Sequence, residues 1–224
     1  MKRFLLGLLV FQFFTFAANA QIQKGSVLLG GKINYTRTYS DLNITSGNLS
    51  SSGISSDAFS FNPQIGYTLK NNWVIGSILS FQLTKAVLNG DNSNNNFADL
   101  AEYAVNGFGV SLFARKYLPF GDKFSAFGEL SSGGLWNNIT TKFESGFGTA
   151  TENRDHSTVL QTNLMAGLAY FPKNWLAIEL STNILTFTSS DQDSETSNSS
   201  SDTLDFGFNS SAINLGVSFF INNK

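Results

Sequence analysis

The sequence predicts an all-β fold: an eight-stranded antiparallel up-and-down β-barrel that crosses a membrane with its strands. Three observations predict it. Segments of about a dozen residues alternate apolar with small or polar side chains, and an extended chain places these on opposite faces. The connections between the segments alternate between short and long. The chain also begins with the pattern of an export signal.

The first twenty residues have the three parts of a signal peptide. Lys2 and Arg3 precede an apolar stretch at 4–16, and small residues at 18–20 form a cleavage site. The apolar stretch is shorter than the roughly 18 residues that a retained membrane helix needs. We therefore predict a cleaved signal peptide at 1–20, one barrel domain at 21–224, and a location in the outer membrane of a Gram-negative-type cell.

Each predicted strand is an alternating segment. The clearest is 59–69, where one face carries Phe, Pro, Ile, Tyr and Leu and the other carries Ser, Asn, Gln, Gly and Thr. It has the about 9–11 residues that a tilted transmembrane strand needs. The predicted strands are 25–37, 58–69, 73–85, 103–118, 124–136, 158–171, 175–187 and 205–221.

The connections predict the orientation of the barrel. Turn-forming residues occupy the short connections at 70–72, 119–123 and 172–174. Because short and long connections alternate, the short turns and both termini lie at one end, which is typical of periplasmic turns and longer extracellular loops. We expect four long polar loops at 38–57, 86–102, 137–157 and 188–204.

The two faces of the predicted strands differ in charge. The outward faces, such as Leu176, Ile178, Leu180 and Ile184 on 175–187, carry no charge in mid-strand. A Lys or Arg at the bilayer midplane would cost about 2–4 kcal/mol, so this absence favours a membrane barrel. Charged residues fall on the inward face instead, at Lys32, Arg115, Glu129 and Glu179.

These inward charges are the first candidate site. The interior of an eight-stranded barrel is just wide enough for side chains to fill it. Two cations can neutralise two carboxylates, and buried charges need such partners. We predict a structural network of ion pairs that closes the lumen. The alternative interpretation is a gated ion path.

Aromatic residues cluster where strands meet the short turns. Two of these turns lead directly into a tryptophan. Amphipathic rings favour the boundary between lipid headgroups and acyl chains. The sequence therefore predicts a periplasmic aromatic girdle of Tyr67, Trp73, Tyr117, Tyr170 and Trp175.

The last predicted strand carries Asn214, Gly216, Phe219 and Phe220 close to the C-terminus. This order of polar residue, glycine and terminal aromatics resembles the signal by which the barrel-insertion machinery recognises its clients, although the chain ends in Asn-Asn-Lys rather than an aromatic residue. With its strand count, loop order and termini, the mature chain resembles the small eight-stranded outer-membrane barrels, the porin-family group that includes the OmpX and OmpA membrane domains. The resemblance includes no catalytic motif.

Other chemistry has little support in the sequence. Zero cysteines exclude disulfides and thiolate metal sites. His156 and Ser157 are adjacent, which does not by itself build the geometry of a hydrolase. Two acidic segments, at 91–102 and 191–195, have oxygen ligands for calcium, but Asn96 replaces the glycine of a calcium loop. We predict no catalysis, no cofactor and no metal.

The predicted function is a structural or surface-interaction role. The expected partners are outer-membrane lipid, the barrel-assembly machinery during insertion, and an extracellular ligand at the loops. The net charge of −2 and the lack of a basic cluster argue against nucleic acid. The alternatives are a narrow porin-like channel, a lipid-modifying enzyme and a soluble periplasmic ligand-binding barrel.

Overall fold

The computed structural model describes residues 22–42, 50–70, 72–91, 100–144, 150–193, 198–207 and 213–221. The predicted signal peptide at 1–20 lies outside these residues. Among them, no helix has the length and apolar character to cross a membrane. The strands are β1 (Val27–Leu42), β2 (Ser50–Thr68), β3 (Trp73–Asp91), β4 (Leu100–Pro119), β5 (Phe124–Glu144), β6 (Ala150–Lys173), β7 (Leu176–Asp193), β8 (Asn198–Phe206) and β9 (Asn214–Ile221).

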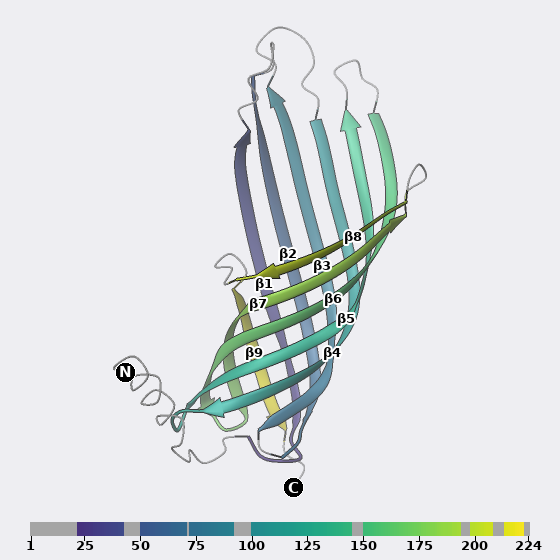
Figure 1. Ribbon diagram of the computed structural model, residues 1–224. Coiled ribbons are helices and arrows are strands. Elements are labelled where there is room, and N and C mark those ends of the chain that lie inside the picture. Colours follow the sequence, from purple (N-terminus) through teal and green to yellow (C-terminus); the bar gives the residue numbers. More distant parts are fainter. Residues whose placement is uncertain are drawn as a thin grey trace, which may run out of the picture.

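The strands form a closed antiparallel ring. Neighbours in the sequence pair from β1 to β7, and β9 then pairs with both β7 and β1 (Figure 1). At the seam, Phe219 of β9 lies between Leu29 of β1 and Leu176 of β7. Closure removes the unpaired edges that an open sheet would expose. The predicted up-and-down barrel is confirmed.

The predicted eighth strand, 205–221, is two strands in the structure. β9 pairs with β7 from Leu176 to Ser181, whereas β8 pairs with the later part of β7, from Leu185 to Asp193. The break follows Phe206, where the Gly207 N–H donates to the Ile184 carbonyl at 2.9 Å. Among the described pairings, β1 beyond Ile33 has β2 as its only partner strand. The ring is therefore closed by β9 alone.

A β-bulge explains why the outward position predicted for Ile184 is wrong. On β6, Met165 pairs with Asn183 and Leu164 pairs with Leu185, so Ile184 has no partner there. One extra residue in a strand reverses the alternation of faces beyond it. Leu185, opposite the outward Leu164, and Phe187 therefore follow the outward face in place of Ile184.

The predicted long loops are largely strands. β5 and β6 pair without interruption from the turn at 120–123 to Glu144 and Ala150, which places most of 137–157 in a ladder. The same holds for most of 38–57, 86–102 and 188–204. A polar composition is typical of loops, but a hairpin with water on both faces has the same composition. Figure 1 shows β1 to β6 extending past the part that β9 closes.

Side chains fill the barrel near the short turns. Buried residues there include Leu28, Val74, Phe113 and Phe127. Two glycines make room for the rings: a Cβ on Gly76 would lie 2.7 Å from Phe113 Cε1, and one on Gly167 would lie 2.6 Å from Phe127 Cε1 and closer still to its Cζ. Such close approach by a neighbouring side chain leaves glycine as the fitting residue.

Candidate functional site

The four inward charges meet inside the barrel. Lys32, Arg115, Glu129 and Glu179 come from β1, β4, β5 and β7, and each is at most 5% exposed. Strand register brings them together, because Arg115 lies directly opposite Glu129 while Lys32 and Glu179 both lie opposite Gly216 of β9. A Cβ on Gly216 would be 3.3 Å from Lys32 Cγ and 3.4 Å from Glu179 Cβ, so the glycine leaves space between them.

Arg115 is the centre of this network. Its Nε donates to Glu129 Oε2 at 2.6 Å, and its Nη1 donates to Glu179 Oε1 and Oε2 at 2.9 and 3.0 Å. Its Nη2 donates to Gln64 Oε1 at 3.0 Å and also pairs with Glu129 Oε2. Lys32 Nζ donates to the other Glu129 oxygen at 2.7 Å. The two cations and two carboxylates balance, as buried charges require.

The position predicted for Tyr117 in the girdle is wrong. Its side chain is fully buried in the lumen, where the O–H donates to Glu179 Oε1 at 2.7 Å and accepts from Arg115 Nη1 at 2.7 Å. Residues two apart on a strand share a face. Because alternation predicts an inward Arg115, it also predicts an inward Tyr117, and the short distance in sequence from Tyr117 to a turn does not change its face.

An aromatic cluster fills the lumen between the charge network and the short turns. Tyr117 lies 5.6 Å from Phe127, 6.3 Å from Phe171 and 6.1 Å from Phe220, measured between ring centroids. The Arg115 guanidinium lies over the Phe127 ring at 4.8 Å, a cation–π geometry. Together, the charge network and this cluster occupy the short-turn half of the lumen.

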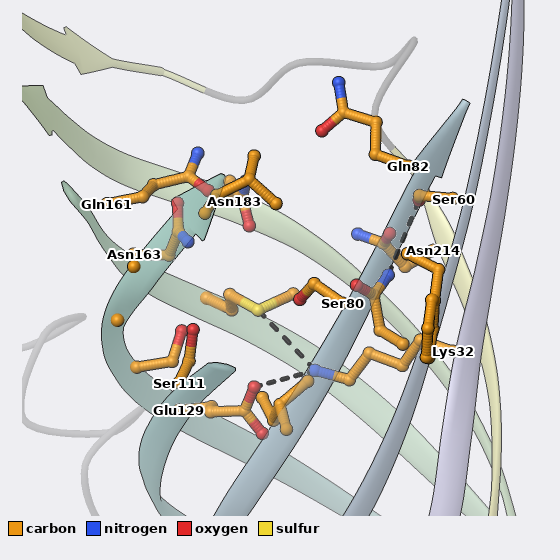
Figure 2. A pocket seen from close by; sticks show the side chains of 18 residues that line it. Lys32, Ser60, Ser80, Gln82, Ser111, Glu129, Gln161, Asn163, Asn183 and Asn214 are labelled. Atoms are coloured by element: carbon orange, nitrogen blue, oxygen red, sulfur yellow. Dashed lines mark hydrogen bonds and ion pairs between the residues drawn. The ribbon is translucent and has the colours of Figure 1, made fainter. Parts of the chain in front are cut away.

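The lumen on the other side of the network contains a polar cavity of about 210 Å³. Figure 2 shows Gln161, Asn163 and Asn183 facing Gln82 and Lys32 across it. Its remaining lining is mostly serine, asparagine and glycine. The Lys32–Glu129 ion pair forms its floor. Alternation along each strand turns these amides inward, whereas the space between them depends on how the strands are arranged around the barrel.

The other four predicted girdle residues face outward. Tyr67, Trp73, Tyr170 and Trp175 are between 38% and 54% exposed. Trp175 stacks on Phe219 with a centroid separation of 6.1 Å. Exposed rings at the short-turn level are what a membrane interface favours.

A second outward row of aromatics was missed. Phe61, Phe81, Phe108 and Trp136 are successive cross-strand partners on β2 to β5, with centroids 5.4 to 6.4 Å apart. Along β3 this row lies about 26 Å from Trp73, at about 3.3 Å per residue. At the usual strand tilt of about 40° this corresponds to about 20 Å along the barrel axis, of the order of the roughly 25 Å apolar band of outer-membrane barrels. The sequence places each of these residues at an outward position of its strand, but only the strand register shows that the four lie side by side.

The predicted C-terminal signal lies on β9. Phe219 faces outward against Trp175, and Phe220 faces inward against Tyr117 and Phe171. Asn214 begins the strand, whose last residue is Ile221; residues 222–224 lie outside the described part.

The two weaker chemical candidates do not form sites in the described part of the chain. His156 Nδ1 lies 2.8 Å from Asn138 Oδ1, while Ser157 Oγ accepts from Asn137 Nδ2 at 3.2 Å. Adjacent strand residues point to opposite faces, so His156 and Ser157 are not a catalytic pair. The acidic segments fall largely outside the described side chains, and those described contain no cluster of three or more His, Asp or Glu suited to a metal.

One protein-family model matches more than half of the chain. The family model for the outer membrane protein beta-barrel domain matches residues 19–192. Among solved structures, Ail of Yersinia pestis, in complex with the heparin analogue sucrose octasulfate, is 14% identical with a TM-score of 0.37, and the match covers 89% of this chain and 100% of Ail. Neisserial surface protein A is 11% identical with a TM-score of 0.34, covering 88% and 97%. No curated protein sequence matches this chain.

Proposed function

This chain belongs to the outer membrane protein beta-barrel domain family and lies in the outer membrane, and we propose that it is a sealed structural barrel that presents a polar strand ladder at the cell surface. The filled short-turn half of the lumen carries this proposal. Arg115, Glu129, Glu179 and Tyr117 occupy the cross-section, and the aromatic cluster lies directly beneath them. A barrel of this size leaves no second route for ions.

The energetics of the network support a plug rather than a gate. An ion path would require Arg115 to leave two carboxylates, Gln64 and Tyr117. Breaking a buried ion pair by removing one partner typically costs about 3–5 kcal/mol, because the remaining charge stays buried. Thermal motion would open such a path only rarely.

The proposed interaction surface is the polar strand ladder, the paired part of β1 to β6 that lies beyond the Phe61–Trp136 row, on the side away from the short turns. Its described cations are already paired: Arg37 with Asp57 at 3.7 Å, Lys85 with Glu102 at 3.0 Å, and both Arg154 and Lys142 with Glu152, at 2.9 and 4.0 Å. Paired charges with exposed hydroxyls and amides suit a neutral polar partner better than a polyanion. As the proposed contact surface, this ladder replaces the four long polar loops that the sequence predicts.

The proposed function also requires that the chain is exported and inserted into the outer membrane. Residues 1–20 direct export, and β9 serves as the strand that the barrel-assembly machinery recognises. Phe219 and the other outward apolar side chains then contact outer-membrane lipid. Because β9 alone closes the ring against β1, its recognition would couple insertion to closure.

Planar-bilayer recording tests the sealed lumen. Pure refolded protein should give no reproducible single-channel current, whereas a conducting porin in the same preparation should. Reproducible steps from the wild-type barrel would contradict the plug and favour the channel alternative.

Whole-cell labelling tests the display of the ladder. The chain contains no cysteine, so single-cysteine variants have no background. Asn153→Cys, on the projecting part of β6, should react with a membrane-impermeant maleimide on intact cells. Asp122→Cys, in a short turn, should react only after permeabilisation. The reverse pattern would invert the proposed orientation.

A further inference from the structure

The cavity above the charge network has hydrogen-bonding capacity that the protein itself does not use. Among the described residues, the side-chain amides of Gln82, Gln161 and Asn183 have no hydrogen-bond partner, and all three line the cavity. Asn163 uses only its oxygen, which accepts from Thr186 Oγ1 at 3.0 Å. Each amide offers both donors and acceptors. The cavity therefore offers both hydrogen-bond donors and acceptors, from Gln82 on β3 and from the amides on β6 and β7 that face it.

The floor adds a buried cation with a spare donor. The Lys32 ammonium has three N–H groups, and its described partners are Glu129 Oε1 at 2.7 Å and the Met165 sulfur at 3.6 Å. Sulfur is a weak acceptor, so at least one N–H is available to a molecule in the cavity. Figure 2 shows this ammonium at the base of the cavity. The lysine is only 5% exposed, and the side chains packed around it and its ion pair with Glu129 hold the ammonium in place.

Charge balance selects the class of ligand. Lys32 and Arg115 are already neutralised by Glu129 and Glu179. An anion would add an uncompensated charge to a partly enclosed site, which is costly. A neutral molecule rich in hydroxyl groups would meet the amides, the serines and the ammonium without that cost.

Size narrows the class further. About 210 Å³ equals the volume of roughly seven waters at about 30 Å³ each. Pockets for drug-sized ligands are larger, at about 300–1,000 Å³. Apolar atoms of Ile78, Leu135 and Met165 also line the cavity and suit the C–H face of a sugar ring. We propose that this cavity binds a neutral monosaccharide from the extracellular side, a function separate from the display of the ladder.

Side-chain amide NMR on the folded, 15N-labelled barrel tests the proposal. Glucose, galactose and N-acetylglucosamine are titrated in turn, with glucuronate as the charged counterpart. At least one neutral sugar should give saturable shifts in the amides of Gln161, Asn163 or Gln82, and glucuronate should bind several-fold more weakly. No saturable shift with any of the three sugars would overturn the proposal and leave a hydrated vestibule.

Two variants on opposite walls separate this cavity from the outer surface. Gln161→Leu on β6 and Gln82→Leu on β3 should each lower the affinity for the sugar that binds by about tenfold, roughly 1.4 kcal/mol. Thr162→Val, on the outward face beside Gln161, should leave it unchanged. Heat-dependent migration in electrophoresis confirms that each variant is folded. Unchanged affinity in both cavity variants, or shifts confined to the projecting ladder, would refute the site.

Discussion

The lumen has two halves, one on each side of the charge network. In both, alternation along the strands turns polar side chains inward, but the two halves differ in whether these polar groups have hydrogen-bond partners. In the short-turn half, Arg115 alone makes contacts with Glu129, Glu179, Gln64 and Tyr117. In the opposite half, amides such as that of Gln161 face open space. Polar groups that satisfy one another form a plug, whereas unsatisfied ones require water or a ligand. Inward polarity by itself therefore does not indicate whether a lumen is closed.

The strongest test of this contrast removes the centre of the plug. Arg115→Met should destabilise the barrel by about 3–5 kcal/mol, because two buried carboxylates lose their main partner. Lys85→Met, which breaks the exposed pair with Glu102, should cost at most about 1 kcal/mol. Urea unfolding in lipid vesicles measures both.

If Arg115→Met does not fold, Glu179→Gln keeps the shape and tests the same network. Its loss of stability should still exceed that of Lys85→Met. Equal stabilities for the buried and exposed variants would show that the network does not hold the short-turn half together.

The second prediction tests whether the Phe61–Trp136 row marks the membrane boundary on the outer surface. Leu112→Arg, on β4 between the two aromatic rows, should cost about 2–4 kcal/mol in vesicles. Asn106→Arg, just beyond Phe108 on the outward side of the same strand, should cost about 0–1 kcal/mol. The measurement is again unfolding in vesicles, and similar costs would mean that the Phe61–Trp136 row does not mark the interface.

The third prediction compares two tyrosines near the short turns. Tyr117→Phe removes the hydroxyl that joins Arg115 to Glu179 and should cost about 1–3 kcal/mol. Tyr170→Phe alters an outward ring and should change stability by no more than about 0.5 kcal/mol. A larger effect at Tyr170 would reverse the assigned roles.

The smallest effect is expected for the amides beside the cavity, compared with an amide in the charge network. Gln64→Leu breaks bonds to Arg115 and Ser218 and should cost about 1–2 kcal/mol. Gln161→Leu removes an amide without a partner and should change unfolding free energy by about 0.5 kcal/mol or less. A cost at Gln161 equal to that at Gln64 would mean that the amides beside the cavity are also structural.

Alternation along the chain was sufficient to predict much of the barrel. It placed Lys32, Arg115, Glu129 and Glu179 inside and Trp73 outside, as the structure has them. It also placed Tyr117 inside, against the girdle assignment. These are local properties, because a strand turns successive side chains to opposite faces wherever it lies.

Loop assignment failed for an identifiable reason. The polar segment at 137–157 has the composition of a loop, yet Thr140 pairs with Arg154 in a continuous ladder. Polar side chains on both faces are compatible with either state, and hairpin pairing decides between them. The bulge at Ile184 is similar, because one unpaired residue leaves no mark in the alternation itself.

The sequence by itself determined which side chains point into the barrel, except beyond the bulge in β7, and it determined where the short turns lie and that the chain is an outer-membrane barrel. Only the tertiary structure decided that Arg115 meets Glu129, that four aromatics form one row, that β9 closes the ring and that a cavity remains above Lys32. The face of the sheet to which a side chain points depends on its position along its own strand, so a short stretch of sequence is enough to predict it. Register and closure depend on hydrogen bonds between strands far apart in the chain, which no local pattern specifies.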